Sequence, residues 1–316
     1  MIHKTITPSI QPLREPYKDA FEALNNLVKK DLTANHPSID TASSPLINPV
    51  GKRIRSLLSF IIAGKQATHS HITLLTGMIE CLHLATLIHD DVIDESELRR
   101  HQPTLHVLMG NHDAILCGDY LLATAFKWQS ALRHHDFNDY MATVLQNIVI
   151  GELNQSNFRH NISVSQAEYE DVIYRKTALL FEASCYGSAL LLELDNPEQY
   201  RNFGRRFGMA YQMIDDYLDY YTNNDNLDKN TLDDWHNGTP TLPLILALQQ
   251  HPEIRTEVKK TFGQNACSEK VLDLIKVSRA LSENMIQQQI NTALEALSHP
   301  SEQLKQLCQW LKYRTH

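Results

Sequence analysis

Two clusters of aspartates are the residues of this 316-residue chain with the clearest capacity for chemistry. Each has the pattern Asp-Asp-x-x-Asp, once at residues 90–94 and once at residues 215–219. On a helix, the first and last carboxylates of such a pattern are four residues apart and share one face. Like charges at that spacing repel, so each cluster costs stability unless a cation neutralises it. Hard carboxylate oxygens select Mg²⁺, Mn²⁺ or Ca²⁺, and Mg²⁺ commonly bridges them to substrate phosphates.

A solvated acidic helix face is the structural alternative for either cluster taken alone. Both clusters, however, end mostly apolar segments, LHLATLIHDD and FGMAYQMIDD, where acidic groups without a partner are costly to bury. Two copies in that setting favour metal binding over a solvated face. An EF-hand is excluded because neither cluster has the loop glycine or the glutamate at the twelfth position.

Basic residues near these clusters could hold the phosphate groups that such metals bind. Taken singly, each is more simply a surface charge. Together with two metal clusters they indicate a site for diphosphates, where arginine makes bidentate contacts and lysine acts as a point charge. The candidates are Lys52, Arg53, Arg55, Arg99, Arg100, Lys176 and Lys229.

The segments that must position these residues have the apolar spacing of helices. Glycine is scarce, 11 in 316, which favours long helices over many short strands. Apolar residues recur at three- and four-residue intervals, as on one face of a helix. Ser165 and Glu168 fit a capping box. The expected helices cover residues 17–31, 71–94, 113–133, 138–156, 166–191, 197–221, 241–250 and 280–297.

Two segments between these helices lack helical spacing. Residues 33–50 are polar and contain prolines, so we interpret them as a loop that leads into GKRIR. Residues 222–243 are rich in Asn, Asp and Thr, and we interpret them as an ordered functional loop. Because the motifs lie on both sides of any candidate boundary, we expect a single domain over residues 1–316. It comprises an N-terminal helix and loop (1–50) and a catalytic bundle (51–316).

The bulk composition excludes several classes of protein. A net charge of −8 argues against a nucleic-acid partner. The five cysteines include no CxxC pair, which argues against a disulfide scaffold and a structural zinc site. The N-terminus carries prolines and charges in place of a signal core, and the apolar run at residues 57–64 is too short to cross a bilayer. We therefore expect a cytoplasmic protein with no transmembrane segment.

From Gly51 to its C-terminus the chain resembles the trans-isoprenyl (polyprenyl) diphosphate synthase family. The two aspartate motifs read HDDVIDESELRR and GMAYQMIDDYLDYY. The segments GKRIR, CGDYLLATAF, GELNQ, YRKTALLF and TPTLPLI fall in the order expected for that family. A single Asp-Asp-x-x-Asp is a weak signal, but two of them with GKRIR before and KTA between are very specific.

The resemblance implies a prenyltransferase with an all-α fold, an antiparallel helical bundle around a deep central cavity, and a homodimer. Its substrates would be isopentenyl diphosphate and an allylic diphosphate, and its product could be handed to the membrane. The two motifs would face each other across the cavity mouth and hold about three Mg²⁺ ions on the allylic diphosphate. These ions would stabilise charge on the departing diphosphate.

The resemblance also implies a role for each matching residue. Expected metal ligands are Asp90, Asp94, Asp215 and Asp219, and the catalytic set adds Asp91, Lys176 and Asp216. The isopentenyl diphosphate site would comprise Lys52, Arg55, His83 and Arg100. The allylic site would comprise Arg99, Lys176, Thr177, Gln212 and Lys229.

Small residues before the first aspartate motif bear on product length. The allylic tail is expected to run along the helix that carries Asp90. Ala85 and Thr86 lie about 6–7.5 Å deeper, at a rise of roughly 1.5 Å per residue. Short-chain members of the family have a bulky aromatic there, so a deeper floor is needed, for which Phe126 or Trp128 are candidates. We expect a long product, with octaprenyl diphosphate for a quinone side chain as the best candidate.

Three departures from the family pattern leave alternatives open. Val50 and Ser56 replace a glycine and a proline around GKRIR, Thr239 replaces a lysine, and His101 replaces a glycine. The alternatives are a short-chain farnesyl or geranylgeranyl diphosphate synthase and a non-catalytic subunit of a heteromeric synthase. A terpene cyclase is disfavoured, because such enzymes lack the second Asp-Asp-x-x-Asp and the GKRIR motif.

Overall fold

The computed structural model describes residues 9–33, 36–48, 51–99, 102–221, 232–264 and 267–314. Within these ranges the chain is almost entirely helical, as expected, and the only strands are a two-residue antiparallel pair, β1 (Leu98–Arg99) and β2 (Gln102–Pro103). Contacts divide the chain into two compact units. Among the described residues, the N-terminal unit comprises those of Ile10–Met141 and Ala183–Glu198, and the C-terminal unit comprises those of Ala142–Glu182 and Gln199–His316. The single domain expected over residues 1–316 stays a prediction.

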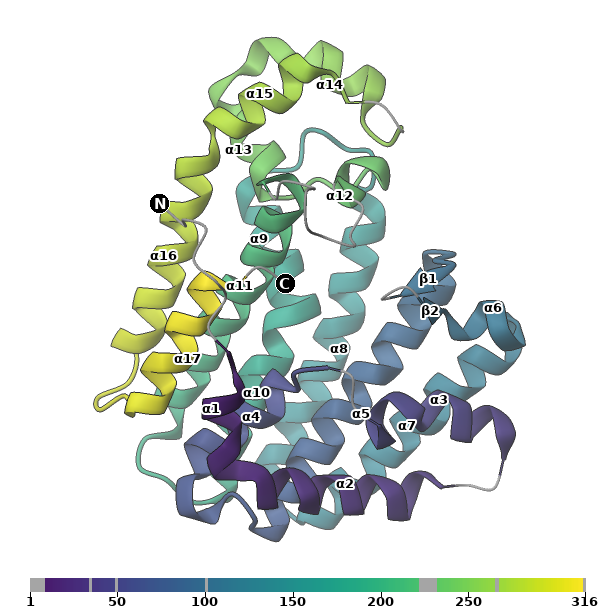
Figure 1. Cartoon of the computed structure of the whole chain (residues 1–316), viewed down its shortest axis with the longest axis vertical. Coiled ribbons are helices and arrows are strands. Elements are labelled where there is room, and N and C mark those ends of the chain that lie inside the picture. Colours follow the sequence, from purple (N-terminus) through teal and green to yellow (C-terminus); the bar gives the residue numbers. More distant parts are fainter. Residues whose placement is uncertain are drawn as a thin grey trace. The chain divides into compact units, whose positions relative to one another are not determined.

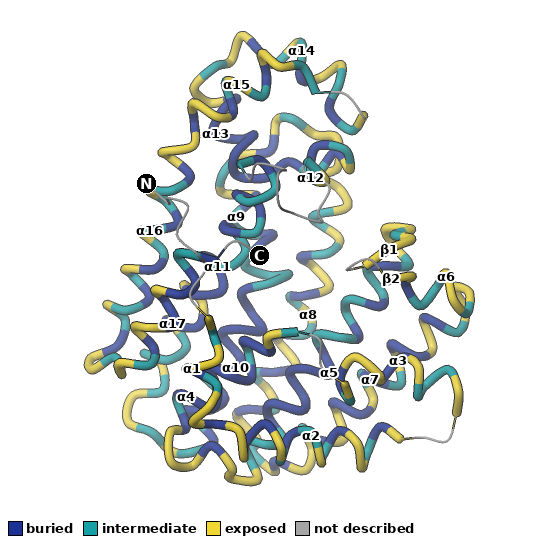
Figure 2. Tube along the Cα trace, in the orientation of Figure 1, coloured by how far each residue is buried: buried dark blue, intermediate teal, exposed yellow. Residues whose placement is uncertain are grey.

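The N-terminal unit is built around two long helices, α5 (Ser70–Ile93) and α7 (Asn111–Leu132), which pack side by side (Figure 1). Figure 2 shows that strands β1 and β2 are exposed and that α6 (Leu105–Met109) has no buried residues. This unit also contains α1 (Gln11–Arg14), α2 (Lys18–Leu32), α3 (Pro37–Ile47) and α4 (Ile54–Ala63). The helix expected over residues 17–31 is α2, and the one expected over residues 71–94 is α5.

Helix α5 is apolar enough to deserve comparison with a membrane span. Among the described residues it is the one helix that meets the length and hydropathy of such a span, which the sequence analysis did not anticipate. Of its most apolar stretch, 61% is buried inside the protein. Core helices of this kind are apolar on every side because neighbouring helices surround them.

The prediction of a loop over residues 33–50 is wrong for most of its length, because residues 37–47 form α3. Pro37 occupies the first turn, where its missing N–H costs no hydrogen bond and its fixed φ favours the helix. Ala42, Ser43 and Leu46 are buried where α3 packs against α2 and α7. Tertiary packing therefore stabilises a segment whose two prolines argued for a loop.

The C-terminal unit begins inside α8 (His135–Phe158) and contains α9 (Gln166–Ile173), which leads into a π-helical turn at Tyr174–Ala178. Helix α10 (Leu179–Leu191) follows, and its residues from Ala183 onward belong to the N-terminal unit. The capping box of Ser165 and Glu168 is confirmed, with both reciprocal hydrogen bonds present at the start of α9. The other helices are α11 (Pro197–Tyr221), α12 (Asp233–His236), α13 (Leu242–Gln250), α14 (Arg255–Thr261), α15 (Glu269–Val277), α16 (Arg279–Glu295) and α17 (Glu302–Tyr313).

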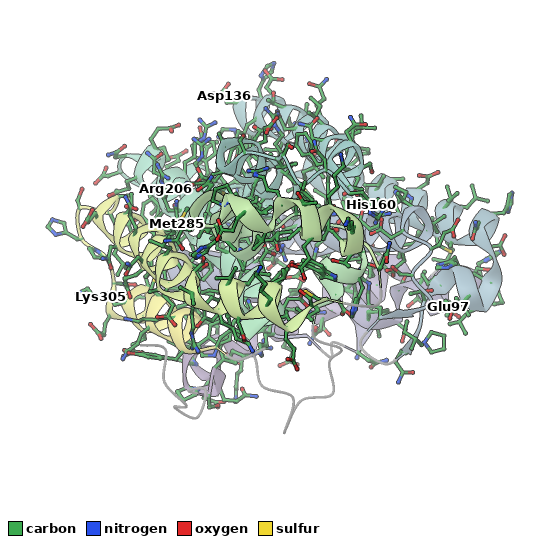
Figure 3. All side chains as sticks on the ribbon, turned by 90° about the horizontal axis from the view of Figure 1, so that it is seen from above. Glu97, Asp136, His160, Arg206, Met285 and Lys305 are labelled. Atoms are coloured by element: carbon green, nitrogen blue, oxygen red, sulfur yellow. The ribbon has the colours of Figure 1, made fainter. Side chains whose placement is uncertain are left out.

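The segment after α11 is folded where the structure describes it. His160, labelled in Figure 3, donates its backbone N–H to the Gly238 carbonyl at 2.7 Å. A Cβ on Gly238 or Gly263 would approach the His160 ring to 2.2 or 2.3 Å, so both positions require glycine. Of the functional loop expected over residues 222–243, residues 222–231 lie outside the described residues, and α12 occupies part of the remainder.

Candidate functional site

The first aspartate motif lies at the carboxyl end of α5, in the N-terminal unit. Asp90 is half-buried, and its carbonyl accepts a hydrogen bond from the backbone N–H of the exposed Asp94, which ends the helix. Asp91 is buried, and both of its carboxylate oxygens accept from Arg99, at 2.8–3.0 Å. The structure therefore brings Asp91 and Arg99 together, and Asp91 serves to position that guanidinium.

A close approach between α5 and α7 fixes the end of α5. A Cβ on Gly118 of α7 would lie 2.1 Å from Nε2 of His89, so only glycine fits at this position. The His89 ring also contacts the Ile115 carbonyl at 3.2 Å and lies 3.6 Å from the Asp119 carboxylate. Gly118 in the motif CGDYLLATAF thus explains how the helices come close enough to hold His89, the residue before Asp90.

Three of the residues expected to bind isopentenyl diphosphate belong to the same unit. Lys52 is exposed in the turn before α4, Arg55 is half-buried on the first turn of that helix, and His83 is half-buried on α5. Arg100 lies outside the described residues, as does Lys229 of the expected allylic site. The assignments of all five residues stay predictions.

Lys176 and Thr177 lie in the π-helical turn at Tyr174–Ala178, in the C-terminal unit. Such turns insert one residue into a helix and occur frequently at functional sites. The turn is packed closely against α8: a Cβ on Gly151 would lie 2.6 Å from Cβ of Arg175 and 3.0 Å from the backbone nitrogen of Lys176. Gly151 therefore permits α8 to approach the turn.

The motif GELNQ on α8 supplies the surroundings of Lys176. The lysine ammonium lies 2.7 Å from the Glu152 carboxylate and donates a hydrogen bond to Oε1 of Gln155 at 2.6 Å. The two side chains of the ion pair are mostly buried, with 23% exposure for Lys176 and 17% for Glu152. Glu152 and Gln155 thus orient the ammonium group, a role that the sequence analysis did not assign.

Gln212 and Asp216 of α11 extend this arrangement through a chain of hydrogen bonds. Thr177 donates to Oε1 of Gln212 at 2.9 Å, and Nε2 of Gln212 donates to Oδ1 of Asp216 at 2.8 Å. The other oxygen of Asp216 accepts from the Tyr169 hydroxyl at 2.6 Å. Both oxygens of this buried aspartate are therefore occupied, so Asp216 positions Gln212 and Thr177.

Burial changes the pKa values of the side chains in this hydrogen-bonded network and next to it. It raises the pKa of Asp216 to about 6, although the hydrogen bonds from Tyr169 and Gln212 favour the charged form. Burial also raises the pKa of Tyr169, to which the adjacent Asp216 contributes. Burial together with the charges of Asp216 and Asp219 raises the pKa of Asp234 well above its usual value. Negative charge is thus concentrated at this end of α11, where a cation is favourable.

The outer aspartates of the second motif have different partners. Oδ1 and Oδ2 of Asp219 accept the backbone N–H groups of Asp233 and Asp234, at 3.0 and 3.1 Å. Asp215 accepts a hydrogen bond from the guanidinium of Arg314, which is buried and stacks over the Tyr211 ring, with Cζ 4.0 Å from the ring centroid. A residue at the far end of the chain thus neutralises an expected metal ligand.

A pocket of about 100 Å³ in the C-terminal unit is lined by these residues. Its lining includes both polar and apolar side chains. Thr239, which stands where the family has a lysine, is one of the polar residues. The polar lining comprises Gln155, Lys176, Thr177, Gln212, Asp216, Asp234, Thr239 and Thr241, and the apolar lining comprises Phe158, Val164, Tyr169, Val172, Ile173 and Pro240.

The carboxylates suit a divalent metal by their chemistry. Asp90, Asp94, Asp215 and Asp219 offer hard oxygens of the type that Mg²⁺ binds. Among the described residues no three metal-ligating side chains are gathered tightly enough to enclose an ion by themselves. This fits Mg²⁺, which typically takes one or two carboxylates and completes its coordination with water and substrate phosphates.

The residues expected to set product length have contrasting surroundings. Ala85 is fully buried on α5, and Thr86 donates its hydroxyl to the His83 carbonyl at 2.9 Å. Phe126 is 48% exposed on α7, whereas Trp128 is buried, with its indole N–H donated to Asp31 at 2.6 Å. The roles of Ala85, Thr86 and Phe126 stay predictions.

Comparisons with known proteins identify the family of this chain. The model of the polyprenyl synthetase family matches residues 36–277. The all-trans-nonaprenyl-diphosphate synthase (geranyl-diphosphate specific) of Rhodobacter capsulatus is 34% identical over 86% of this chain and 85% of its own length. The octaprenyl diphosphate synthase of Escherichia coli (strain K12) is 32% identical over 81% of this chain and 82% of its own.

Solved structures have the same fold. A polyprenyl synthase from Caulobacter crescentus CB15, complexed with calcium and isoprenyl diphosphate, superimposes with a TM-score of 0.87 at 28% identity. The match covers 99% of this chain and 100% of that one. A decaprenyl diphosphate synthase from Rhodobacter capsulatus gives a TM-score of 0.87 at 27% identity, over 98% and 100% of the two chains. The expected fold class and family are confirmed, and the chain belongs to the polyprenyl synthetase family of prenyltransferases.

Proposed function

We propose that this chain condenses isopentenyl diphosphate with an allylic diphosphate, head to tail, and repeats the step to make a long all-trans polyprenyl diphosphate. The proposal rests above all on two Asp-Asp-x-x-Asp motifs that lie at the ends of long helices beside basic side chains. Relatives named as nonaprenyl and octaprenyl diphosphate synthases support a long product. Octaprenyl diphosphate for a quinone side chain is our specific candidate.

The C-terminal unit would bind the allylic diphosphate. Lys176 offers an ammonium group that Glu152 and Gln155 already orient, and Thr177 and Gln212 offer further hydrogen bonds. Oriented donors of this kind stabilise charge on a departing group without having to reorganise during the reaction.

Metal ions would be held by the outer aspartates of each motif. We propose Asp215 and Asp219 as ligands in the C-terminal unit and Asp90 and Asp94 in the N-terminal unit. Bound Mg²⁺, about three ions per site, would supply Lewis-acid stabilisation of the diphosphate oxygens. Asp216 is instead occupied by hydrogen bonds that hold Gln212 in place.

The N-terminal unit would bind isopentenyl diphosphate. Lys52, Arg55 and His83 are the proposed anchors of its diphosphate, which leaves its double bond to attack the allylic carbon. Arg99 of the same unit, which Asp91 holds at 2.8 Å, is instead proposed as a cation for the allylic diphosphate. The proton lost after the attack would pass to the released diphosphate.

A homodimer accounts for exposed apolar side chains on two helices. Ile115 and Leu116 of α7 are 43% and 52% exposed, and Val149 and Leu153 of α8 are each 60% exposed. Val149 and Leu153 are four residues apart and therefore share one face of α8. Exposed apolar faces of this kind commonly mark protein interfaces. We propose that a second copy of the chain covers them, in the cytoplasm, and that the product is handed to the membrane.

One assay tests the proposed reaction. Purified protein is incubated with isopentenyl diphosphate, Mg²⁺ and geranyl or farnesyl diphosphate, and the products are sized by mass spectrometry. A long polyprenyl diphosphate is the expected product, and chelation of the metal should abolish it. A product that stops at farnesyl or geranylgeranyl diphosphate would support the short-chain alternative. An absence of product from the homodimer would support a non-catalytic subunit.

A further inference from the structure

The turn that carries Lys52 is surrounded by buried charges that the proposed reaction does not use. Arg53 is 8% exposed and Glu80 is 7% exposed, both within the N-terminal unit. Charged side chains are almost never fully buried unless they are paired. The contacts of these two residues therefore indicate what the turn is built to do.

Arg53 joins the start of α4 to two other helices. Its Nη1 donates to Oδ1 of Asn25 on α2 at 2.7 Å, and its Nη2 donates to the Leu46 carbonyl on α3. Its backbone has a φ of 46°, in the left-handed region that is unfavourable for residues other than glycine. The side-chain anchors hold the backbone in this conformation, in which Lys52 is exposed.

Arg14 holds the same turn from another direction. Its guanidinium donates a hydrogen bond to the Lys52 carbonyl and stacks over the Phe21 ring, with Cζ 4.0 Å from the ring centroid. The backbone of Lys52 is thus held while its side chain is exposed to solvent.

Glu80 links the turn to α5. Its Oε1 accepts the hydroxyl of Ser56 at 2.5 Å, and its charge favours the protonated forms of Arg14 and Arg53, partly offsetting the lowering of their pKa values by burial. Ser56 stands where the resembled family has proline, and proline has no hydroxyl to donate. The Ser56 hydroxyl therefore makes a contact to α5 that proline at this position would lack.

We propose that Arg53 is a positioning residue for the isopentenyl diphosphate anchor, and that Asn25, Arg14 and the Ser56–Glu80 hydrogen bond complete the support. Arg53 cannot itself bind diphosphate while its guanidinium is engaged by Asn25 and Leu46. The inference rests on the proposed function, because it takes Lys52 and Arg55 as the anchors. A misplacement of about 1 Å in such a group can cost as much as 100-fold in rate.

The test uses Asn25→Ala, which removes the acceptor and leaves Arg53 in place. We expect KM for isopentenyl diphosphate to rise about tenfold, with kcat and KM for the allylic primer within about twofold of wild type. Asn25→Asp retains an acceptor and should restore the wild-type KM. The matched control is Arg133→Gln, because Arg133 is an exposed arginine that also has a positive φ, 52°.

Calorimetric measurement of isopentenyl diphosphate binding to Lys52→Ala separates the anchor role of Lys52 from the positioning role of Arg53. If Lys52→Ala binds as tightly as wild type, the anchor itself is misassigned and both hypotheses are overturned. If Lys52→Ala binds weakly but Asn25→Ala binds normally, only the positioning role of Arg53 is overturned. Should thermal melting show that Asn25→Ala is unfolded, Arg53→Lys and Ser56→Ala provide the same comparison.

Discussion

Arg314, beyond the end of α17, neutralises Asp215, the first aspartate of the second Asp-Asp-x-x-Asp motif. The arginine side chain is 5% exposed, and its Nε and Nη1 have no hydrogen-bond partner among the described residues. The pair thus satisfies Asp215 in the absence of metal, although it leaves the guanidinium only partly satisfied. A metal ion on Asp215 must compete with this arginine.

We therefore expect Mg²⁺ to stabilise Arg314→Met against thermal unfolding more than it stabilises the wild-type protein. Without metal it should lose about 1–3 kcal/mol of stability, because Asp215 and Asp219 are left with uncompensated repulsion. Addition of Mg²⁺ should then raise its Tm by more than it raises that of wild type. Lys305→Ala, which removes an exposed ion pair on α17, is the control. Equal Mg²⁺ shifts in Arg314→Met and wild type would contradict the competition.

Removal of a metal ligand should abolish turnover. Asp90→Ala is expected to lower kcat by at least about 100-fold at saturating Mg²⁺, because a lost ligand removes several kcal/mol of transition-state stabilisation. The fold should survive, since deletion of one of several like charges relieves repulsion. Asp215→Ala is a less clean test, because it leaves the buried Arg314 without its partner. Steady-state kinetics beside the exposed control Asp136→Ala would check this, and near-normal turnover of Asp90→Ala would refute the metal assignment.

Thr239 lines the pocket that also contains Lys176 and Gln212, so a lysine there should strengthen the allylic site. We predict that Thr239→Lys lowers KM for the allylic primer. The gain in binding free energy should not exceed that of one charge-assisted hydrogen bond, about 1.5–3 kcal/mol. Thr239→Met adds comparable length without charge and is the matched control. An unchanged KM for the lysine variant would mean that Asp234 or Asp216, which line the same pocket, binds the new ammonium.

Ala85→Phe should shorten the product. Ala85 is fully buried on α5, roughly 7.5 Å from Asp90 along the helix axis at 1.5 Å per residue. We expect farnesyl or geranylgeranyl diphosphate as the main product by mass spectrometry, with the first condensation intact. Overpacking should cost about 1–3 kcal/mol, so thermal melting must accompany the assay. Ala280→Phe, at an exposed position on α16, is the control. If Ala85→Phe still makes a long chain, Ala85 does not line the path of the tail.

Asp216 should make the metal-free protein less stable as pH rises. Its pKa in the folded protein is about 6, above the value of about 3.8 for an unperturbed aspartate, so the folded state retains the proton that the unfolded state releases first. The free energy of unfolding should therefore fall by up to about 3 kcal/mol between pH 4 and 6 and then level off. Denaturant unfolding of wild type and Asp216→Asn over this range is the measurement. An equal slope in both proteins would contradict the assignment.

Periodicity in the sequence was sufficient to predict α5, α7 and α11, because each buries a continuous apolar face over many turns. It failed for α3, whose prolines resemble those of a loop and whose stability comes from packing. The partners of Lys176 could have been suspected, since Glu152 and Gln155 lie in a motif already recognised. No sequence pattern indicated the roles of Tyr169 and Arg314. Tyr169 contacts Asp216 across 47 residues of chain, and Arg314 contacts Asp215 across 99 residues, so only the fold brings each pair together.

The π-helical turn at Tyr174–Ala178 also constrains the number of residues that can connect α9 to α10. Each residue of a helix turns it by about 100°, so the inserted residue rotates α9 by that amount relative to the helix that follows. Deletion of Ala178 from the turn would keep Lys176 and Thr177 in the chain. It would nevertheless swing Tyr169 away from Asp216, and the tight packing of Gly151 against Arg175 would be lost. Chain length in this segment is thus as constrained as the identity of the lysine that it carries.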